Sequence, residues 1–220
     1  MDKRTEIIQE ITSKGLLPLY FHADPETSAG VLEALYQAGI RTIEYTNRGP
    51  EALGNFEILK TKVERALPGM WLGIGTIKDA SAARDFIEAG ADFLISPGIP
   101  EDVFDEAYSE KILWIPGCMT VTEIMQAEQF GISFIKIFPG NILGPGFIQA
   151  IREIFPALSF MPTGGVELEE GNLRNWFASG IAAVGMGSKL ITKGMLSDRN
   201  YKGITQATRQ ALDMIQNLRK

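Results

Sequence analysis

The chain has 220 residues, of which 45% are hydrophobic and 22% are charged, and its formal net charge is −6. This is globular composition with enough apolar residues for a large core, and the lack of basic runs argues against a nucleic-acid-binding protein. With one cysteine, Cys118, and one histidine, His22, the sequence excludes an intramolecular disulfide, a thiolate metal cage and a histidine metal site, and disfavours a Ser-His-Asp triad.

The beginning of the chain has no targeting pattern. Residues 1–11 are charged, with Ile7, Ile8 and Ile11 at helical spacing, which is not the pattern of a signal peptide. No apolar run approaches the length of about 20 residues that a membrane-spanning helix needs. We therefore expect a cytoplasmic protein.

Strand-like and helix-like patterns then alternate along the chain. Short apolar runs bounded by Gly or Pro predict about eight strands, and each is followed by a segment with helical spacing. The predicted strands are residues 16–21, 41–46, 71–77, 91–96, 111–116, 133–138, 158–162 and 181–186. Glycines stand before several of them, where a helix end favours positive φ, at Gly39, Gly90, Gly131 and Gly180.

This alternation predicts a parallel sheet covered by helices. About eight units fit a (β/α)8 TIM barrel with a short N-terminal helix, and no change of composition marks a linker. We predict a single domain over residues 1–220. A doubly wound open sheet is the alternative.

Lys136 is unusual because it lies in the apolar run of residues 133–138. Strand alternation puts Phe134, Lys136 and Phe138 on one face, and neither face has a polar pattern. Lysines are almost never buried without a partner. The side chain therefore either reaches water or a structural partner, or serves as a desolvated amine nucleophile.

Other polar residues stand at the expected carboxyl ends of the strands, where the sites of such barrels form. If Ile43 packs against helices, Glu44 faces the interior, and Arg48 follows the same strand. Glu44 is either a structural partner for Lys136 or a group that transfers protons. Thr76 lies at the end of the third strand, and small residues and prolines end the fourth and fifth strands at 96–98 and 116–117.

Glycines follow the last two strands, at Pro162–Gly165 and Gly185–Ser188. Backbone amides beside such glycines approach phosphate oxygens closely, and barrels commonly bind phosphate at this place. The alternative is that the glycines only form tight turns. A lysine, a carboxylate, an arginine and a phosphate cradle together favour Schiff-base chemistry on a phosphorylated keto acid.

The ordered set of motifs resembles the family of 2-dehydro-3-deoxyphosphogluconate (KDPG) and 4-hydroxy-2-oxoglutarate aldolases. The resemblance spans about residues 17–190. It is carried by E-x-T-x-R at 44–48, G-x-G-T at 73–76, S-P-G at 96–98, I-P-G at 115–117, K-x-F-P at 136–139, P-T-G-G at 162–165 and G-x-G-S at 185–188.

The resemblance implies a class I aldolase that splits 2-dehydro-3-deoxy-6-phosphogluconate into pyruvate and glyceraldehyde 3-phosphate in Entner–Doudoroff carbohydrate metabolism. It implies a homotrimer. On the residues we expect no cofactor or metal and no nucleic-acid or membrane partner. Lys136 would form the Schiff base and Glu44 would act as general acid and base. Substrate would contact Arg48, Thr76, Pro97, Phe138, Thr163, Gly164, Gly165, Gly187 and Ser188.

Other functions remain open on the residues alone. The galactonate epimer, 4-hydroxy-2-oxoglutarate and other 2-oxo acids are alternative substrates, because C4 stereochemistry depends on fine placement of one hydroxyl. A metal-dependent phosphosugar lyase or isomerase on a similar barrel is a second candidate. A catalytically silent binder of phosphorylated ligands is a third. His22 and Cys118 have no assigned role.

Overall fold

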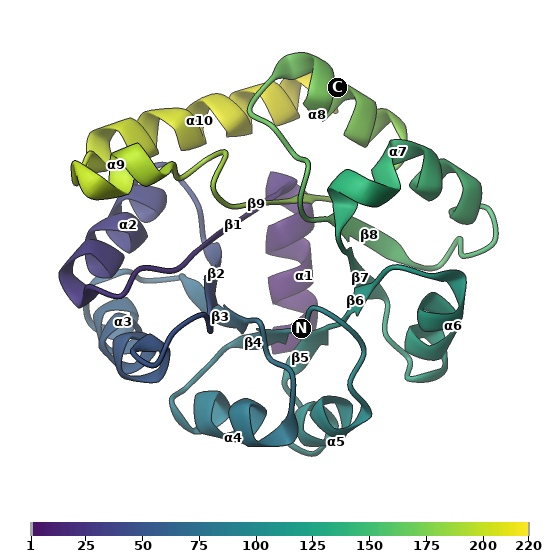
Figure 1. Cartoon of the computed structure of the whole chain (residues 1–220), viewed down its shortest axis with the longest axis horizontal. Helices are drawn as coiled ribbons and strands as arrows, with labels where there is room; N and C mark the ends of the chain where they lie inside the picture. The colour runs from purple at the N-terminus through teal and green to yellow at the C-terminus, as the bar shows by residue number, and fades with distance from the viewer. Residues whose placement is uncertain (1, 220) are drawn as a thin grey trace.

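The structure is a computed structural model that describes residues 2–219, so Met1 and Lys220, the ends of the predicted domain, lie outside it. Helices surround a curled parallel sheet (Figure 1). The strands are β1 (Leu16–Tyr20), β2 (Thr42–Thr46), β3 (Trp71–Gly75), β4 (Phe93–Ile95), β5 (Leu113–Ile115), β6 (Gly117–Cys118), β7 (Phe134–Ile137), β8 (Ser159–Pro162) and β9 (Val184–Met186). The helices are α1 (Lys3–Lys14), α2 (Pro25–Gln37), α3 (Ala52–Ala66), α4 (Ala80–Glu88), α5 (Glu101–Ser109), α6 (Val121–Gln129), α7 (Gly140–Ile151), α8 (Glu170–Ala178), α9 (Lys193–Ser197) and α10 (Tyr201–Leu218).

The strands form two hydrogen-bonded groups, and all their pairings are parallel. One group has the order β5-β4-β3-β2-β1-β9, and the other has the order β6-β7-β8. A single parallel bridge between Thr163 and Gly185 connects β8 to β9. The predicted α/β class is therefore confirmed, with a curled sheet at its centre.

The predicted fifth strand was wrong in its extent. Residues 111–116 give only β5, and the chain resumes pairing one residue later as β6. Pro116 separates the two segments, and a proline has no N–H to donate to a ladder. Its carbonyl still accepts from the amide of Lys136 at 2.9 Å, so β7 stays attached at this point.

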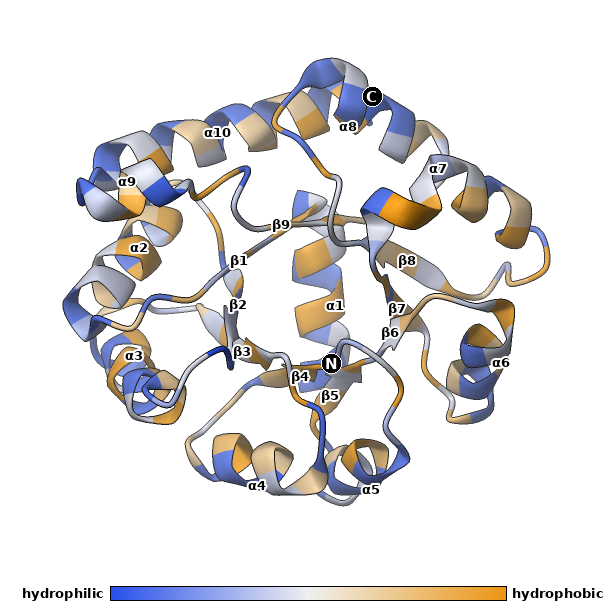
Figure 2. Cartoon of the chain, in the orientation of Figure 1, coloured by the Kyte–Doolittle hydropathy of each residue, from blue (hydrophilic) through white to orange (hydrophobic). Residues whose placement is uncertain are grey.

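The first helix, α1, covers the amino ends of the strands and is seen at the centre of the ring (Figure 1). Its fully buried Ile7 and Ile11 pack in the interior cluster that also contains Phe93 and Phe134. In Figure 2 the middle of α1 is coloured as hydrophobic. The interior below the candidate site is therefore filled with hydrocarbon.

A buried carboxylate fixes α1 to the sheet. The Asp92 carboxylate accepts from the backbone amide of Leu72 at 2.8 Å and pairs with the ammonium groups of Lys60 at 2.7 Å and Lys3 at 2.9 Å. Its side chain is almost fully buried. A buried carboxylate needs this number of partners to offset its lost hydration.

The second cluster lies between the sheet and the helices, where the outward residues of the strands meet apolar helix faces. The long α10 contributes Ile204, Ala211 and Ile215, as its helical spacing predicts. Helix α7 ends at Ile151, and the nearby Ile154 lies outside the core with 63% of its surface exposed. Among the described residues, no helix has the length and apolar character needed to cross a membrane.

Candidate active site

Lys136 and Glu44 face each other in the interior of the curled sheet. Nζ of Lys136 lies 3.6 Å from Oε1 of Glu44, and the two side chains are 7% and 1% exposed. Neither carboxylate oxygen of Glu44 has a hydrogen-bond partner among the described residues. Because an unsatisfied buried polar group is costly, such a group points to a partner that arrives with substrate or water.

The alternation of each strand explains why the two side chains meet. Ile135 and Ile137 point outward into the helix-facing core, which leaves Lys136 to point inward. Ile43 and Tyr45 do the same on β2 and leave Glu44 inside. The prediction that Glu44 faces the interior if Ile43 packs against the helices is therefore confirmed, and Lys136 faces the same interior.

One of the two residues that pair with Lys136 in the sheet is a glycine and has no side chain. Lys136 pairs with Gly117 on β6 and with Met161 on β8. A β-carbon at Gly117 would lie 2.5 Å from the carbonyl oxygen of Pro97. The absence of a side chain at Gly117 therefore allows the backbone at Pro97 to approach β6, the strand that pairs with the Lys136 strand β7.

Arg48 and Thr76 follow two strands that pair along their whole length, β2 and β3. Arg48 is exposed, and Thr76 is half-buried. Thr76 has φ of 65°, in the left-handed region that is uncommon for a residue other than glycine. Such backbone strain is frequent at functional sites, where the surrounding structure holds it in place.

A cavity of about 370 Å³ opens at the carboxyl ends of β1, β8 and β9. Most of the predicted substrate-binding residues line it, namely Arg48, Phe138, Thr163, Gly164, Gly165, Gly187 and Ser188. Lys136, Glu44, Thr76 and Pro97 are not part of its lining. Phe138 connects the two regions, because it lines the cavity and its ring centre lies 5.3 Å from Nζ of Lys136.

Two lysines that the sequence patterns did not predict also line this cavity, Lys189 and Lys193. The ammonium of Lys189 pairs with the Glu167 carboxylate at 3.0 Å, whereas no ion pair of Lys193 is seen in residues 2–219. Both lysines follow the G-x-G-S motif within six residues, and this closeness to a predicted phosphate-binding motif could have identified them from the sequence. The cavity thus has three cationic residues in its lining, counting Arg48.

Two buried ionisable groups near the site stay neutral. Burial, and next the neighbouring Tyr45, raise the pKa of Tyr20 well above its usual value, and its hydroxyl donates to the carbonyl of Ser28 at 2.8 Å. Burial, and next the Glu123 carboxylate, raise the pKa of Cys118 to about 12. In residues 2–219 no group of three or more His, Cys, Asp or Glu side chains is placed to hold a metal ion.

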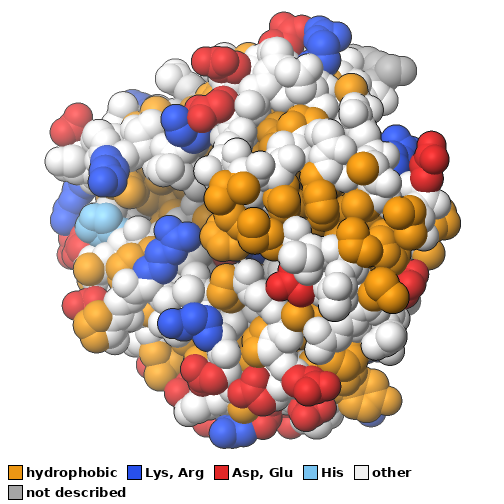
Figure 3. Space-filling model, turned by 45° about the vertical axis from the view of Figure 1, so that its right-hand side comes forward, with side chains coloured by type: hydrophobic (Ala, Val, Ile, Leu, Met, Phe, Trp, Pro, Cys, Tyr) orange, Lys and Arg blue, Asp and Glu red, His pale blue; other side chains and the backbone are white. Residues whose placement is uncertain are grey.

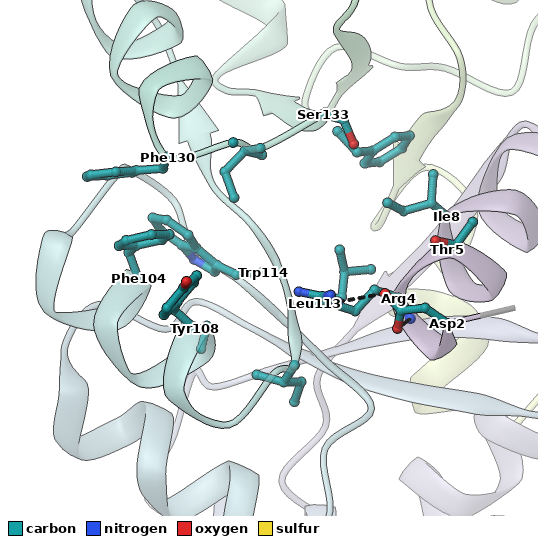
Figure 4. A pocket seen from close by; sticks show the side chains of 15 residues that line it. Asp2, Arg4, Thr5, Ile8, Phe104, Tyr108, Leu113, Trp114, Phe130 and Ser133 are labelled. Atoms are coloured by element: carbon teal, nitrogen blue, oxygen red, sulfur yellow. Dashed lines mark hydrogen bonds and ion pairs between the residues drawn. The ribbon is translucent and has the colours of Figure 1, made fainter.

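A second cavity, of about 340 Å³, lies at the opposite end of the sheet (Figure 4). It is formed between α1, α5 and the amino ends of β5 and β7, and its wall includes Phe104, Tyr108 and Phe130. The Arg4 guanidinium at its edge is paired with Asp2 at 3.0 Å. None of the predicted site residues lines it, so the candidate site is the one at the carboxyl ends.

A buried lysine beside a carboxylate inside a curled parallel sheet is the arrangement of a lysine-dependent aldolase, a lyase that acts on carbon–carbon bonds. The chain belongs to the KDPG and KHG aldolase family, because the model of that family matches residues 7–207.

Individual relatives agree with this assignment. The chain is 33% identical over 172 residues to a probable 2-dehydro-3-deoxy-6-phosphogalactonate aldolase of Rhizobium meliloti, covering 78% of this chain and 79% of that protein. It is 31% identical over 212 residues to a 2-dehydro-3-deoxy-phosphogluconate aldolase of Pseudoalteromonas atlantica, covering 93% of each. The crystal structure of a KDPG aldolase of Legionella pneumophila, with pyruvate captured as a covalent carbinolamine, superposes with a TM-score of 0.84 at 27% identity, covering 92% of this chain and 96% of that one.

Proposed function

We propose that the protein is a class I aldolase that splits 2-dehydro-3-deoxy-6-phosphogluconate into pyruvate and glyceraldehyde 3-phosphate. The observation that carries the proposal is the buried ammonium of Lys136, 3.6 Å from a Glu44 carboxylate whose oxygens have no hydrogen-bond partner within residues 2–219. Family membership and the carbinolamine in the Legionella relative support the same chemistry.

In this proposal the neutral amine of Lys136 attacks the C2 ketone and forms a carbinolamine, which loses water to give an iminium ion. A base removes the proton of the C4 hydroxyl, and the electron pair of the C3–C4 bond moves toward the iminium nitrogen. Glyceraldehyde 3-phosphate leaves, and the remaining enamine takes a proton at C3. Water then releases pyruvate and restores the amine.

Glu44 is the group that we assign to the proton transfers, directly or through a water molecule. Its carboxylate is the acidic side chain beside Lys136, and both of its oxygens are free to accept or deliver a proton. General acid–base catalysis by one positioned carboxylate contributes about 10²- to 10⁴-fold to a rate.

We assign the substrate carboxylate to Arg48 and Thr76. Arg48 offers the planar set of N–H donors that suits a carboxylate, and the strained backbone of Thr76 holds its hydroxyl at the end of the paired strand. Pro97, Phe138 and Thr163 would contact the carbon chain between the carboxylate and the phosphate.

We assign the phosphate to the backbone amides of Gly164, Gly165 and Gly187 and to Ser188. These residues line one cavity, and the cations of Lys189 and Lys193 stand in the same wall. Glycine allows the backbone to approach the anion, and amide dipoles favour negative charge. A phosphorylated substrate therefore suits this cavity better than a neutral one.

The same proposal includes a closed (β/α)8 barrel in a single domain. Two contacts between the two groups of strands support this closure. The bridge between Thr163 and Gly185 joins β8 to β9. Between β4 and β6, the amide of Gly117 donates to the carbonyl of Gly98, which follows β4, at 3.0 Å. The ring of helices in Figure 1 agrees with such a closure. A cytoplasmic location stays a prediction from the sequence.

We also propose a homotrimer. Figure 3 shows hydrophobic side chains gathered on one face of the molecule, on the side of α6 and α7. Large apolar side chains on these two helices and the segment before them are 39–66% exposed: Met119, Val121, Met125 and Ile142. Exposed apolar patches of this kind mark protein–protein interfaces.

The galactonate epimer is the second candidate substrate, favoured by the name of the Rhizobium meliloti relative. A panel of 2-oxo acids, comprising both phosphorylated epimers and 4-hydroxy-2-oxoglutarate, separates the candidates when each is assayed for release of pyruvate. The proposal expects the highest kcat/KM for the gluconate compound. Activity lost in chelator and restored by Mg²⁺ or Mn²⁺ would favour a metal-dependent lyase, and binding without turnover would favour a silent binder.

A further inference from the structure

Strand β3 leaves two inward positions without side chains. Leu72 and Ile74 point outward into the helix-facing core, so Gly73 and Gly75 face the interior. A β-carbon on Gly73 would lie 2.2 Å from the ring of Phe93. A β-carbon on Gly75 would lie 1.8 Å from Oε1 of Glu44. The side chains of Phe93 and Glu44 therefore occupy the two spaces that the glycines leave.

The contact at Gly75 involves most of the Glu44 side chain. Besides Oε1, the Cδ and Cγ atoms of Glu44 would lie 2.5 Å and 2.7 Å from the added carbon. The φ angle of Gly75 is not in the left-handed region, so the backbone does not by itself require glycine there. What the position requires is the absence of a side chain against the carboxyl group.

Little else holds the carboxyl group of Glu44 in place. Its oxygens accept no hydrogen bond within the described chain, and Nζ of Lys136, at 3.6 Å, is beyond hydrogen-bonding distance. In such a case the shape of the surrounding wall determines where a buried side chain lies. The bare backbone of Gly75 is part of that wall, because an added β-carbon there would overlap the carboxyl group.

We infer that Gly75 is a positioning residue for proton transfer, which acts by giving the Glu44 carboxyl group its place beside Lys136. The inference rests on the proposed function. It concerns the step in which the Schiff base of pyruvate loses a proton from C3 to the Glu44 carboxylate. The C–H electrons form the C2–C3 double bond, and the π electrons of the C2–N bond move to nitrogen. The reverse step returns a proton to C3.

The experiment compares two measurements on Gly75→Ala. In D₂O, exchange of the C3 hydrogens of pyruvate reports proton transfer, whereas borohydride trapping of pyruvate on Lys136 reports formation of the Schiff base. We expect exchange to fall about 100-fold, as for misplacement of a reacting group by about 1 Å, with trapping retained. Gly54→Ala is the matched control, because Gly54 is exposed on α3 and has open space at its β-carbon. It should leave both measurements unchanged.

The outcomes separate this inference from the proposed function. A wild-type protein that forms no adduct on Lys136 would overturn the proposed function and the inference with it. If the wild type forms the adduct and exchanges protons, two results on Gly75→Ala would overturn the inference alone. One is exchange at the wild-type rate, and the other is an equal loss of trapping and exchange, which would mean that the methyl group blocks pyruvate.

A second comparison keeps the test valid if Gly75→Ala does not fold. Glu44→Ala removes the atoms that the new methyl group would meet, so the double variant Gly75→Ala/Glu44→Ala should fold and melt close to Glu44→Ala. Thermal unfolding followed by circular dichroism measures this. A double variant that remains unfolded would show that the methyl group clashes elsewhere, and it would overturn the inference.

Discussion

The ammonium of Lys136 and the carboxylate of Glu44 lie 3.6 Å apart in the buried interior of the curled sheet. At this distance the two groups form an ion pair but no hydrogen bond. A structural salt bridge normally has hydrogen bonds from several donors to the carboxylate. The Asp92 carboxylate at the other end of the sheet provides the contrast, since it is held by two lysines and one backbone amide.

Glu44→Gln tests the role of this carboxylate. The amide has nearly the same shape but cannot take a proton at neutral pH, so the Schiff base should still form while proton transfer fails. We expect borohydride trapping of pyruvate to persist and cleavage of the phosphorylated substrate to fall by about 10²- to 10⁴-fold. Cleavage at the wild-type rate would remove Glu44 from the mechanism.

Lys193→Met tests the cationic wall of the cavity. Lys193 is exposed, so its attraction for a phosphate is screened by water and is comparable to a surface ion pair of about 0.2–1 kcal/mol. We expect KM for the phosphorylated substrate to rise by about 1.5- to 5-fold, with little change in kcat.

The control for this variant is Lys202→Met, which removes an exposed lysine that does not line the cavity. Steady-state kinetics at low ionic strength measure both variants. If both variants raise KM equally, the cause is the change in net charge. If Lys193→Met does not raise KM, the Lys193 ammonium does not contribute to phosphate binding.

Cys118 should be unreactive in the native protein. Its thiol is fully buried, and burial raises its pKa to about 12, so at pH 8 it remains protonated and does not act as a nucleophile. In the unfolded chain the thiol returns to a pKa of about 8.5 and should react readily. Alkylation by iodoacetamide at pH 8, followed by mass spectrometry with and without denaturant, measures the difference. Equal rates would contradict the burial of this side chain.

Met125→Glu tests the proposed trimer. Met125 lies on α6 in the apolar face and is 49% exposed, so a carboxylate there would be desolvated if a second copy covered it. We expect the variant to sediment as a monomer, while Met125→Leu keeps the assembly of the wild type. If Met125→Glu sediments with the same assembly mass as the wild type, the interface between copies does not include Met125.

The sequence predicted much of this arrangement because strand alternation has a period of two. That period is sufficient to place Lys136 and Glu44 inward once their strands are recognised. It does not give the register between strands, and the contact between Gly75 and Glu44 depends on the register of β2 against β3. Gly75 was therefore recognised only as part of a motif.

Other features were beyond a local pattern. Pro116 interrupts the strand hydrogen bonding locally, but a local pattern does not show that β5 pairs with β4 while β6 pairs with β7. Lys193 lies on α9, a five-residue helix too short to give an apolar period. The roles of the predicted catalytic and binding residues stay predictions, because position alone does not establish what a side chain does to a substrate.

Trapping with borohydride is the most direct measurement of the central claim. Pyruvate and borohydride are added to the wild-type protein, to Lys136→Ala, and to Lys60→Ala, which removes another largely buried lysine. Peptide mass spectrometry then locates the adduct. We predict a reduced three-carbon adduct on Lys136 in the wild type and in Lys60→Ala, and none in Lys136→Ala. An adduct that persists in Lys136→Ala, or a wild-type protein without one, would contradict the assignment of Lys136 as the Schiff-base lysine.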